Sequence, residues 1–117
     1  YPFPSSGHAI PLLDFAKALV SRDVQVTVLV TPRNLPLVLT NFSPLLQTHL
    51  LPSPEFSNPN LNMHVTMITF MHHHHHSLIV DWAQAQAQPT PSSAVISDFL
   101  LGWTHLLARD LCWDKDI

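Results

Sequence analysis

Apolar residues recur with a helical period near the start of the chain and with a period of two shortly afterwards. Between Pro11 and Ser21 they fall at i, i+3, i+4 and i+7, which predicts a short amphipathic helix with Pro11 in its first turn. Residues 24–30 (VQVTVLV) place valines on one face and Gln25 and Thr27 on the other. This β-branched alternation predicts a strand.

Weaker signals follow in the middle of the chain. The stretch from Asn34 to Asn41 predicts a brief helix capped by Asn34, despite Pro36, and residues 46–51 (LQTHLL) predict a second strand. Residues 52–62 contain three prolines and three asparagines. They predict an irregular loop of the kind that often carries specificity.

The second half again alternates helical and extended patterns. Residues 63–88 predict one or two helices, and one face of this segment carries Leu78, Ile79 and Trp82. After the breakers at 89–93, residues 94–97 (AVIS) predict a short buried strand. Residues 102–111 have a helical period, and no closing strand is expected after them.

Strands that alternate with helices indicate an α/β fold, with a Rossmann-like parallel sheet covered by helices on both faces. Tyr1 is not a methionine, no signal-peptide pattern follows it, and residues 1–4 resemble a strand leaving its sheet. We therefore expect a first strand ahead of Tyr1, with the strands at 24–30, 46–51 and 94–97 as second, third and fourth. The doubly wound order 3-2-1-4 then places a crevice at the carboxyl ends of strands one and four.

Composition narrows the class of protein. The 117 residues are enough for one domain, and 46% apolar with 11% charged residues indicates a soluble globular chain without a membrane span. With five Lys and Arg and a formal charge of −3, no basic patch is available for nucleic acid or anionic lipid. Cys112 is the only cysteine, and we interpret it as a small hydrophobic residue. A single cysteine fits a reducing compartment, and we expect the protein to be cytoplasmic.

The expected crevice brings His8 and Asp98 into consideration, because both follow a strand that ends there. His8 lies in the loop ahead of the helix that begins near Pro11, where the helix dipole favours neutral imidazole. Such a base can take a proton from a substrate hydroxyl while Asp98 orients its other ring nitrogen. No G-x-S-x-G is present, so the attacking group belongs to a substrate. Alternatively, His8 is a polar turn residue and Asp98 caps the next segment.

Two other features bear on ligands. Of the consecutive histidines at 72–76, only His72 and His76 align on a helix, so we interpret the run as a low-complexity expansion or engineering remnant in an exposed segment, with incidental metal affinity. A His-rich metal-binding module stays a minor alternative. Gly7 and Gly102 are the only glycines, so a nucleotide phosphate must be held elsewhere. Structural roles are expected for His49, His64 and His105.

Three blocks of sequence resemble one family. Residues 2–19 (PFPSSGHAIPLLDFAKAL) closely resemble the opening of plant UDP-glycosyltransferases, residues 26–34 (VTVLVTPRN) their second strand and turn, and residues 95–104 (VISDFLLGWT) their fourth strand and following helix. The blocks keep the family's order and spacing up to about Arg109. The resemblance implies the N-terminal half of a GT-B fold, with residues 1–117 as a partial acceptor-binding domain and the donor-binding domain absent.

The resemblance also implies roles for individual residues. His8 would be the general base and Asp98 would complete the dyad, while Gly7, Phe99 and Trp103 would bind the acceptor. The implied reaction is inverting transfer of glucose or a similar hexose from a UDP-sugar to a hydroxyl of a small lipophilic acceptor such as a flavonoid.

No metal or other cofactor is implied, and the expected partners are the acceptor and the UDP-sugar, without nucleic acid or an obligate protein partner. The chain alone is expected to be inactive. The alternative is a truncated product that only binds hydrophobic small molecules.

Overall fold

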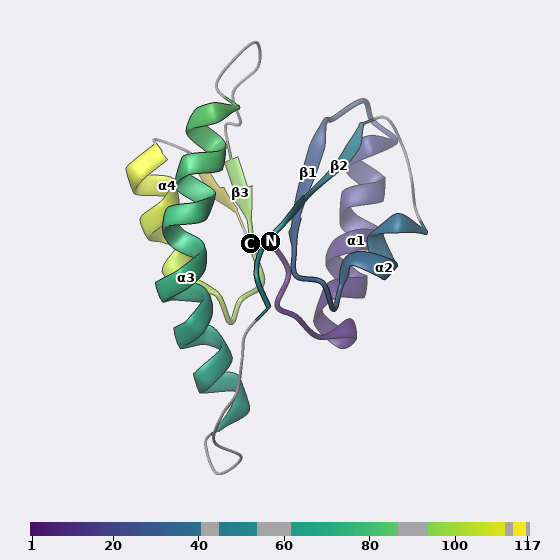
Figure 1. Ribbon diagram of the computed structural model, residues 1–117. Coiled ribbons are helices and arrows are strands. Elements are labelled where there is room, and N and C mark those ends of the chain that lie inside the picture. The colour runs from purple at the N-terminus through teal and green to yellow at the C-terminus, as the bar shows by residue number, and fades with distance from the viewer. Residues whose placement is uncertain (41–44, 54–61, 87–93, 112–113, 117) are drawn as a thin grey trace. The chain divides into compact units, whose positions relative to one another are not determined.

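The computed structural model describes residues 1–40, 45–53, 62–86, 94–111 and 114–116, which fall into two compact units (Figure 1). The first unit spans Tyr1–Ser53 and the second Pro54–Ile117. Each contains one pair of parallel strands together with helices, so the predicted α/β class is confirmed. Most of the predicted loop at 52–62, and Cys112, lie outside the described residues.

The described residues of the first unit form two helices and two strands. They are α1 (Ser6–Val20), β1 (Val26–Val30), α2 (Leu35–Leu39) and β2 (Leu46–Leu50). β1 and β2 pair in parallel from Val26 opposite Leu46 to Val30 opposite Leu50, as predicted for the second and third strands. Both helices lie on the same side of this strand pair (Figure 1).

The core of the first unit explains why these segments adopt their structures. Alternate valines of β1 point toward the helices, and the apolar stripe of α1 meets them. The cluster consists of Leu13, Ala16, Val28, Val30, Val38 and Leu46. β1 begins at Val26 rather than at residue 24, because Asp23 adopts a left-handed φ of 63° after α1 and leaves Val24 exposed.

Helix α1 begins five residues before the predicted start, so the prediction that His8 lies in a loop ahead of the helix is wrong. Ser5 is extended at the N-cap position, and its carbonyl accepts hydrogen bonds from the backbone N–H groups of His8 (3.0 Å) and Ala9 (2.8 Å). Pro11 is inside the helix and cannot bond the Gly7 carbonyl. Gly7 is exposed, so water can reach that carbonyl.

Where the structure describes the second unit, it forms one long helix, two short helical segments and two short strands. They are α3 (Met63–Ala85), β3 (Ala94–Ile96), the 3₁₀ helix η1 (Gly102–Thr104), α4 (His105–Leu111) and β4 (Asp114–Asp116). β4 pairs in parallel with β3, Ala94 opposite Asp114, so the expectation of no closing strand is wrong. Backbone hydrogen bonds to β3 define this strand. Its sequence Asp-Lys-Asp has no apolar alternation, so the pattern of residues did not predict it.

Helix α3 is a single helix whose buried positions recur every four residues. Asn62 caps it by accepting a hydrogen bond from the Val65 N–H (3.1 Å). Of the predicted face, Ile79 is fully buried, whereas Leu78 is exposed. The buried positions are Met67, Met71, His75, Ile79 and Ala83. Placing the whole histidine run in an exposed segment was therefore wrong, because His75 belongs to this buried stripe.

Candidate active site

His8 lies in the first turn of α1 with a half-buried imidazole. Its ring packs against the Phe3 ring, with centroids 5.3 Å apart and planes tilted by 58°. The expected proximity of His8 to the N-terminal, positive end of a helix is confirmed, although His8 lies within that helix instead of ahead of it. Gly7 precedes it on the same turn and is exposed, with no atom within 4 Å of where a Cβ would be.

The backbone of Phe3 is held by two donors. Its carbonyl accepts hydrogen bonds from the Ser5 N–H (2.7 Å) and from Nδ2 of Asn34 (3.3 Å), which is 31 residues further along the chain. Asn34 occupies the N-cap position of α2, as predicted, but its side chain makes no capping hydrogen bond. This contact was not predicted from the sequence, because Asn before a helix normally indicates a cap.

Asp98 follows β3 by two residues and is buried. Its Oδ1 accepts a hydrogen bond from the Leu100 N–H (2.9 Å), and its backbone carbonyl accepts one from the Leu101 N–H (2.9 Å). The carboxylate thus stabilises the turn that follows, which is the capping role considered as the alternative for this residue.

The turn after Asp98 is also held by buried hydroxyl groups. Oγ of Ser97 lies 2.7 Å from Oγ1 of Thr104, and Thr104 Oγ1 donates to the Leu101 carbonyl at 2.7 Å. A hydroxyl carries a single proton, so Ser97 is the donor to Thr104. This pair links Thr104, the last residue of η1, to Ser97, which directly follows β3.

The remaining predicted acceptor-binding residues differ in exposure. Phe99 is 72% exposed beside Asp98, whereas Trp103 is buried. The Trp103 ring stacks on His72 at 5.2 Å with 17° between the planes, and His76 meets it edge-on at 6.0 Å. These histidine contacts with Trp103 were not anticipated from the sequence.

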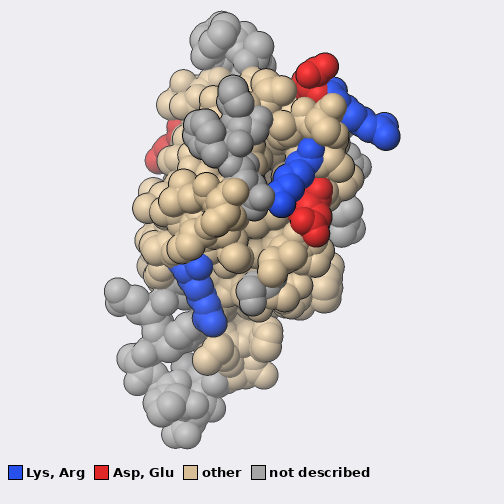
Figure 2. Space-filling view, turned by 90° about the vertical axis from the view of Figure 1, so that its right-hand side faces the viewer, with Lys and Arg blue, Asp and Glu red and all other residues tan. Residues whose placement is uncertain are grey.

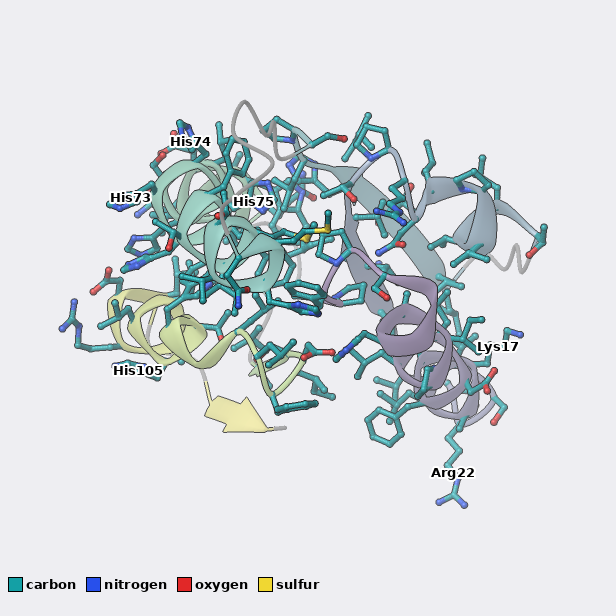
Figure 3. The ribbon with its side chains drawn as sticks, turned by 90° about the horizontal axis from the view of Figure 1, so that it is seen from below. Lys17, Arg22, His73, His74, His75 and His105 are labelled. Carbon is teal, nitrogen blue, oxygen red and sulfur yellow. The ribbon has the colours of Figure 1, made fainter. Side chains whose placement is uncertain are left out.

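The histidine run therefore divides by helix face. Figure 3 shows His73 and His74 on one side of α3 and His75 on another. Nε2 of His76 lies 3.2 Å from Oδ2 of Asp110, without hydrogen-bond geometry. The other carboxylate oxygen, Asp110 Oδ1, accepts a hydrogen bond from Nε of Arg109 at 3.0 Å. Within the described part of the chain, no group of three or more His, Cys, Asp or Glu side chains is arranged to hold a metal ion.

Charged side chains are sparse on the surface. On the face shown in Figure 2, Lys and Arg lie apart from one another, some of them beside Asp or Glu, and form no continuous basic patch. No helix within the described ranges is long and apolar enough to cross a membrane.

Curated proteins with similar sequences include UDP-glycosyltransferases from several plants. UDP-glycosyltransferase 89B2 of Stevia rebaudiana is 36% identical over 129 residues, which cover 95% of this chain and 26% of that protein. Flavonol 3-O-glucosyltransferase UGT89B1 of Arabidopsis thaliana is 36% identical, over 92% of this chain and 25% of that protein. This chain belongs to the plant UDP-glycosyltransferase family. It spans about a quarter of the length of these relatives, and no protein-family model matches it.

Solved structures of plant UDP-glycosyltransferases share the fold. UGT89C1 of Arabidopsis thaliana complexed with quercetin aligns with a TM-score of 0.83 and 28% identity, over 97% of this chain and 32% of that one. UGT2 of Phytolacca americana complexed with UDP-2fluoro-glucose and pterostilbene aligns with a TM-score of 0.80 and 28% identity, over 97% of this chain and 28% of that one. The prediction of a partial, Rossmann-like GT-B fold is therefore confirmed.

Proposed function

We propose that this chain is the acceptor-binding part of an inverting glycosyltransferase, which transfers glucose or a similar hexose from a UDP-sugar to a hydroxyl of a small lipophilic acceptor such as a flavonoid. Support comes from a relative named as a flavonol 3-O-glucosyltransferase and from a structural neighbour that contains quercetin. The observation that carries the proposal is the half-buried imidazole of His8 in the first turn of α1, beside the apolar ring of Phe3.

In this proposal His8 acts as the general base. Its imidazole removes the proton of the acceptor hydroxyl as that oxygen attacks the anomeric carbon of the UDP-sugar. The new C–O bond forms on the face opposite UDP, the bond between the anomeric carbon and the UDP oxygen breaks, and UDP leaves with the electron pair. The configuration at the anomeric carbon is inverted.

Asp98 is proposed to complete the dyad by stabilising the imidazolium that forms on His8. One carboxylate oxygen is already fixed by the Leu100 N–H, which would hold the side chain in a single orientation. Gly7, Phe99 and Trp103 are proposed to contribute to acceptor binding. The Phe99 ring offers the exposed apolar surface that a planar phenol would cover.

The donor must be held by residues outside this chain. Gly7 and Gly102 are its only glycines, and neither belongs to a glycine-rich phosphate-binding loop. We propose that transfer needs no metal, because the base is a side chain and the leaving diphosphate is bound by a separate donor domain.

The test is sugar transfer from UDP-glucose to a panel of flavonols, by the chain alone and by the chain fused to the donor-binding domain of a related plant UDP-glycosyltransferase. We expect turnover only in the fusion, and we expect His8→Ala to abolish it. The donor domain alone and the exposed-histidine variant His64→Ala in the fusion are controls. No transfer in either format would contradict the proposal and favour a truncated product that only binds hydrophobic small molecules.

A further inference from the structure

We propose that Asn34 is a positioning residue for His8, acting through the backbone of Phe3. The inference rests on the proposed function, in which His8 is the general base. Asn34 and His8 are far apart in the sequence, yet three hydrogen bonds and one ring contact within the first unit connect them.

The connection begins at the buried amide of Asn34. Its Nδ2 donates to the Phe3 carbonyl at 3.3 Å, and the side chain is 2% exposed. The same carbonyl accepts the Ser5 N–H at 2.7 Å, and the Ser5 carbonyl in turn accepts the His8 N–H at 3.0 Å. Asn34 thus fixes the segment from which α1 starts, and α1 carries His8 in its first turn.

A second route runs through the side chain of Phe3. The centroid of its ring lies 5.3 Å from the centroid of the His8 imidazole, and Phe3 is almost fully buried. Because the Asn34 amide holds the backbone of Phe3, it also limits where this ring can lie. The orientation of the imidazole therefore depends on Asn34 through both the backbone and the ring.

The use made of the Asn34 amide points to this role. Asn34 occupies the N-cap position of α2, where its side chain would ordinarily accept a hydrogen bond from that helix. It makes no such bond, and α2 is a helix of only five residues. The amide instead contacts a segment 31 residues away that leads directly to the base.

Loss of this hydrogen bond would affect the chemical step more than donor binding. The nitrogen of a general base must lie within about 2.6–3.2 Å of the oxygen whose proton it removes. A small displacement of a reacting group can reduce a rate by up to about 100-fold. We expect Asn34→Ala in the fusion protein to lower kcat about tenfold or more and to leave the KM for UDP-glucose unchanged.

The matched control is Thr40→Val. Thr40 lies at the other end of α2 and donates a hydrogen bond from its side chain to the Leu37 carbonyl (2.9 Å), within the helix. The Thr40→Val substitution removes one side-chain-to-backbone hydrogen bond at the same helix and leaves the contact with Phe3 intact. We expect its kcat to match that of the natural sequence.

A direct measurement does not require activity. In the 117-residue chain, the carbon-bound protons of the His8 imidazole, assigned by comparison with His8→Gln, report by NMR on the nearby Phe3 ring. We expect Asn34→Ala to shift these resonances and Thr40→Val to leave them in place. Thermal melting of each variant establishes that it is folded.

Asn34→Asp supplies a second variant of nearly identical shape. Its protonated carboxyl can donate to the Phe3 carbonyl, whereas its ionised form cannot. The difference in His8 chemical shift between Asn34→Asp and the natural chain should therefore shrink as the pH falls through the carboxyl titration, and Asn34→Ala should show no such recovery.

Unchanged His8 resonances in folded Asn34→Ala, or an unchanged kcat, would overturn the positioning role alone. Full activity in His8→Ala would overturn the proposed function and this inference together, so the two failures are distinguishable.

Discussion

Ser97 and Thr104 share a buried hydrogen bond, with 2.7 Å between their side-chain oxygens. The Thr104 proton is directed to the Leu101 carbonyl, so Ser97 donates and Thr104 accepts. The pair links the end of β3 to η1 across the turn that contains Asp98. Its loss would therefore affect both the stability of the second unit and the position of the proposed dyad carboxylate.

Thr104→Val should lower the free energy of unfolding by about 1–3 kcal/mol, because the Ser97 O–H loses its acceptor in a buried place. Urea denaturation measures this change. In a double-mutant cycle, Ser97→Ala with Thr104→Val should cost less than the sum of the single changes. Additive costs would show that the two hydroxyls do not interact. Thr40→Val, at an exposed site, is the control and should change stability by less than about 0.5 kcal/mol.

Alanine substitution across the histidine run should give a periodic result. His75→Ala should lower the free energy of unfolding by about 2 kcal/mol or more, because it leaves a cavity in the buried stripe of α3. His72→Ala should cost about 1 kcal/mol through loss of the stacked contact with Trp103. His73→Ala, at an exposed position, should change the free energy of unfolding by less than about 0.5 kcal/mol. Equal effects at all positions, measured by chemical denaturation, would contradict the assigned burial.

The stability of the first unit should depend on pH through His49 of β2. Burial lowers the pKa of His49 below its ordinary value, so the unfolded chain binds a proton more readily than the native one. The neutral form stabilises the fold above about pH 6.5, and this contribution is lost as the pH falls below that value toward the native pKa.

Urea midpoints at pH 5, 6, 7 and 8 test this dependence. His49→Gln should lose less stability than the natural chain between pH 7 and pH 5, because its side chain does not titrate. An identical pH dependence for the two proteins would exclude His49 as a source.

Gly7→Ala should stabilise the chain and also test the proposed acceptor site. Gly7 lies in α1 with an ordinary helical backbone, and a Cβ there would meet no atom within 4 Å. Alanine should therefore raise the free energy of unfolding by about 0.5–1 kcal/mol, seen as a higher Tm. In the fusion protein, a higher KM for the acceptor would support a place for Gly7 in the acceptor site. A lower Tm would contradict the open space around it.

Local patterns predicted most of the regular structure. The valines of 24–30 and the apolar period after Pro11 identified β1 and most of α1, because alternation and helical spacing express contacts within one element. The order of the motifs also indicated the family and the α/β fold. The exact starts of α1 and β1 escaped prediction, because they depend on Ser5 as an N-cap and on the left-handed turn at Asp23.

The sequence by itself determined the family, the alternation of helices and strands, and His8 and Asp98 as the candidate residues. Only the tertiary structure decided that Asn34 holds Phe3, that His75 is buried while His73 is exposed, and that β4 pairs with β3. Each of these depends on groups from distant parts of the chain meeting within a unit. A single amide, imidazole or polar strand has no periodic signal that specifies such a partner, so burial and long-range hydrogen bonding determine its role.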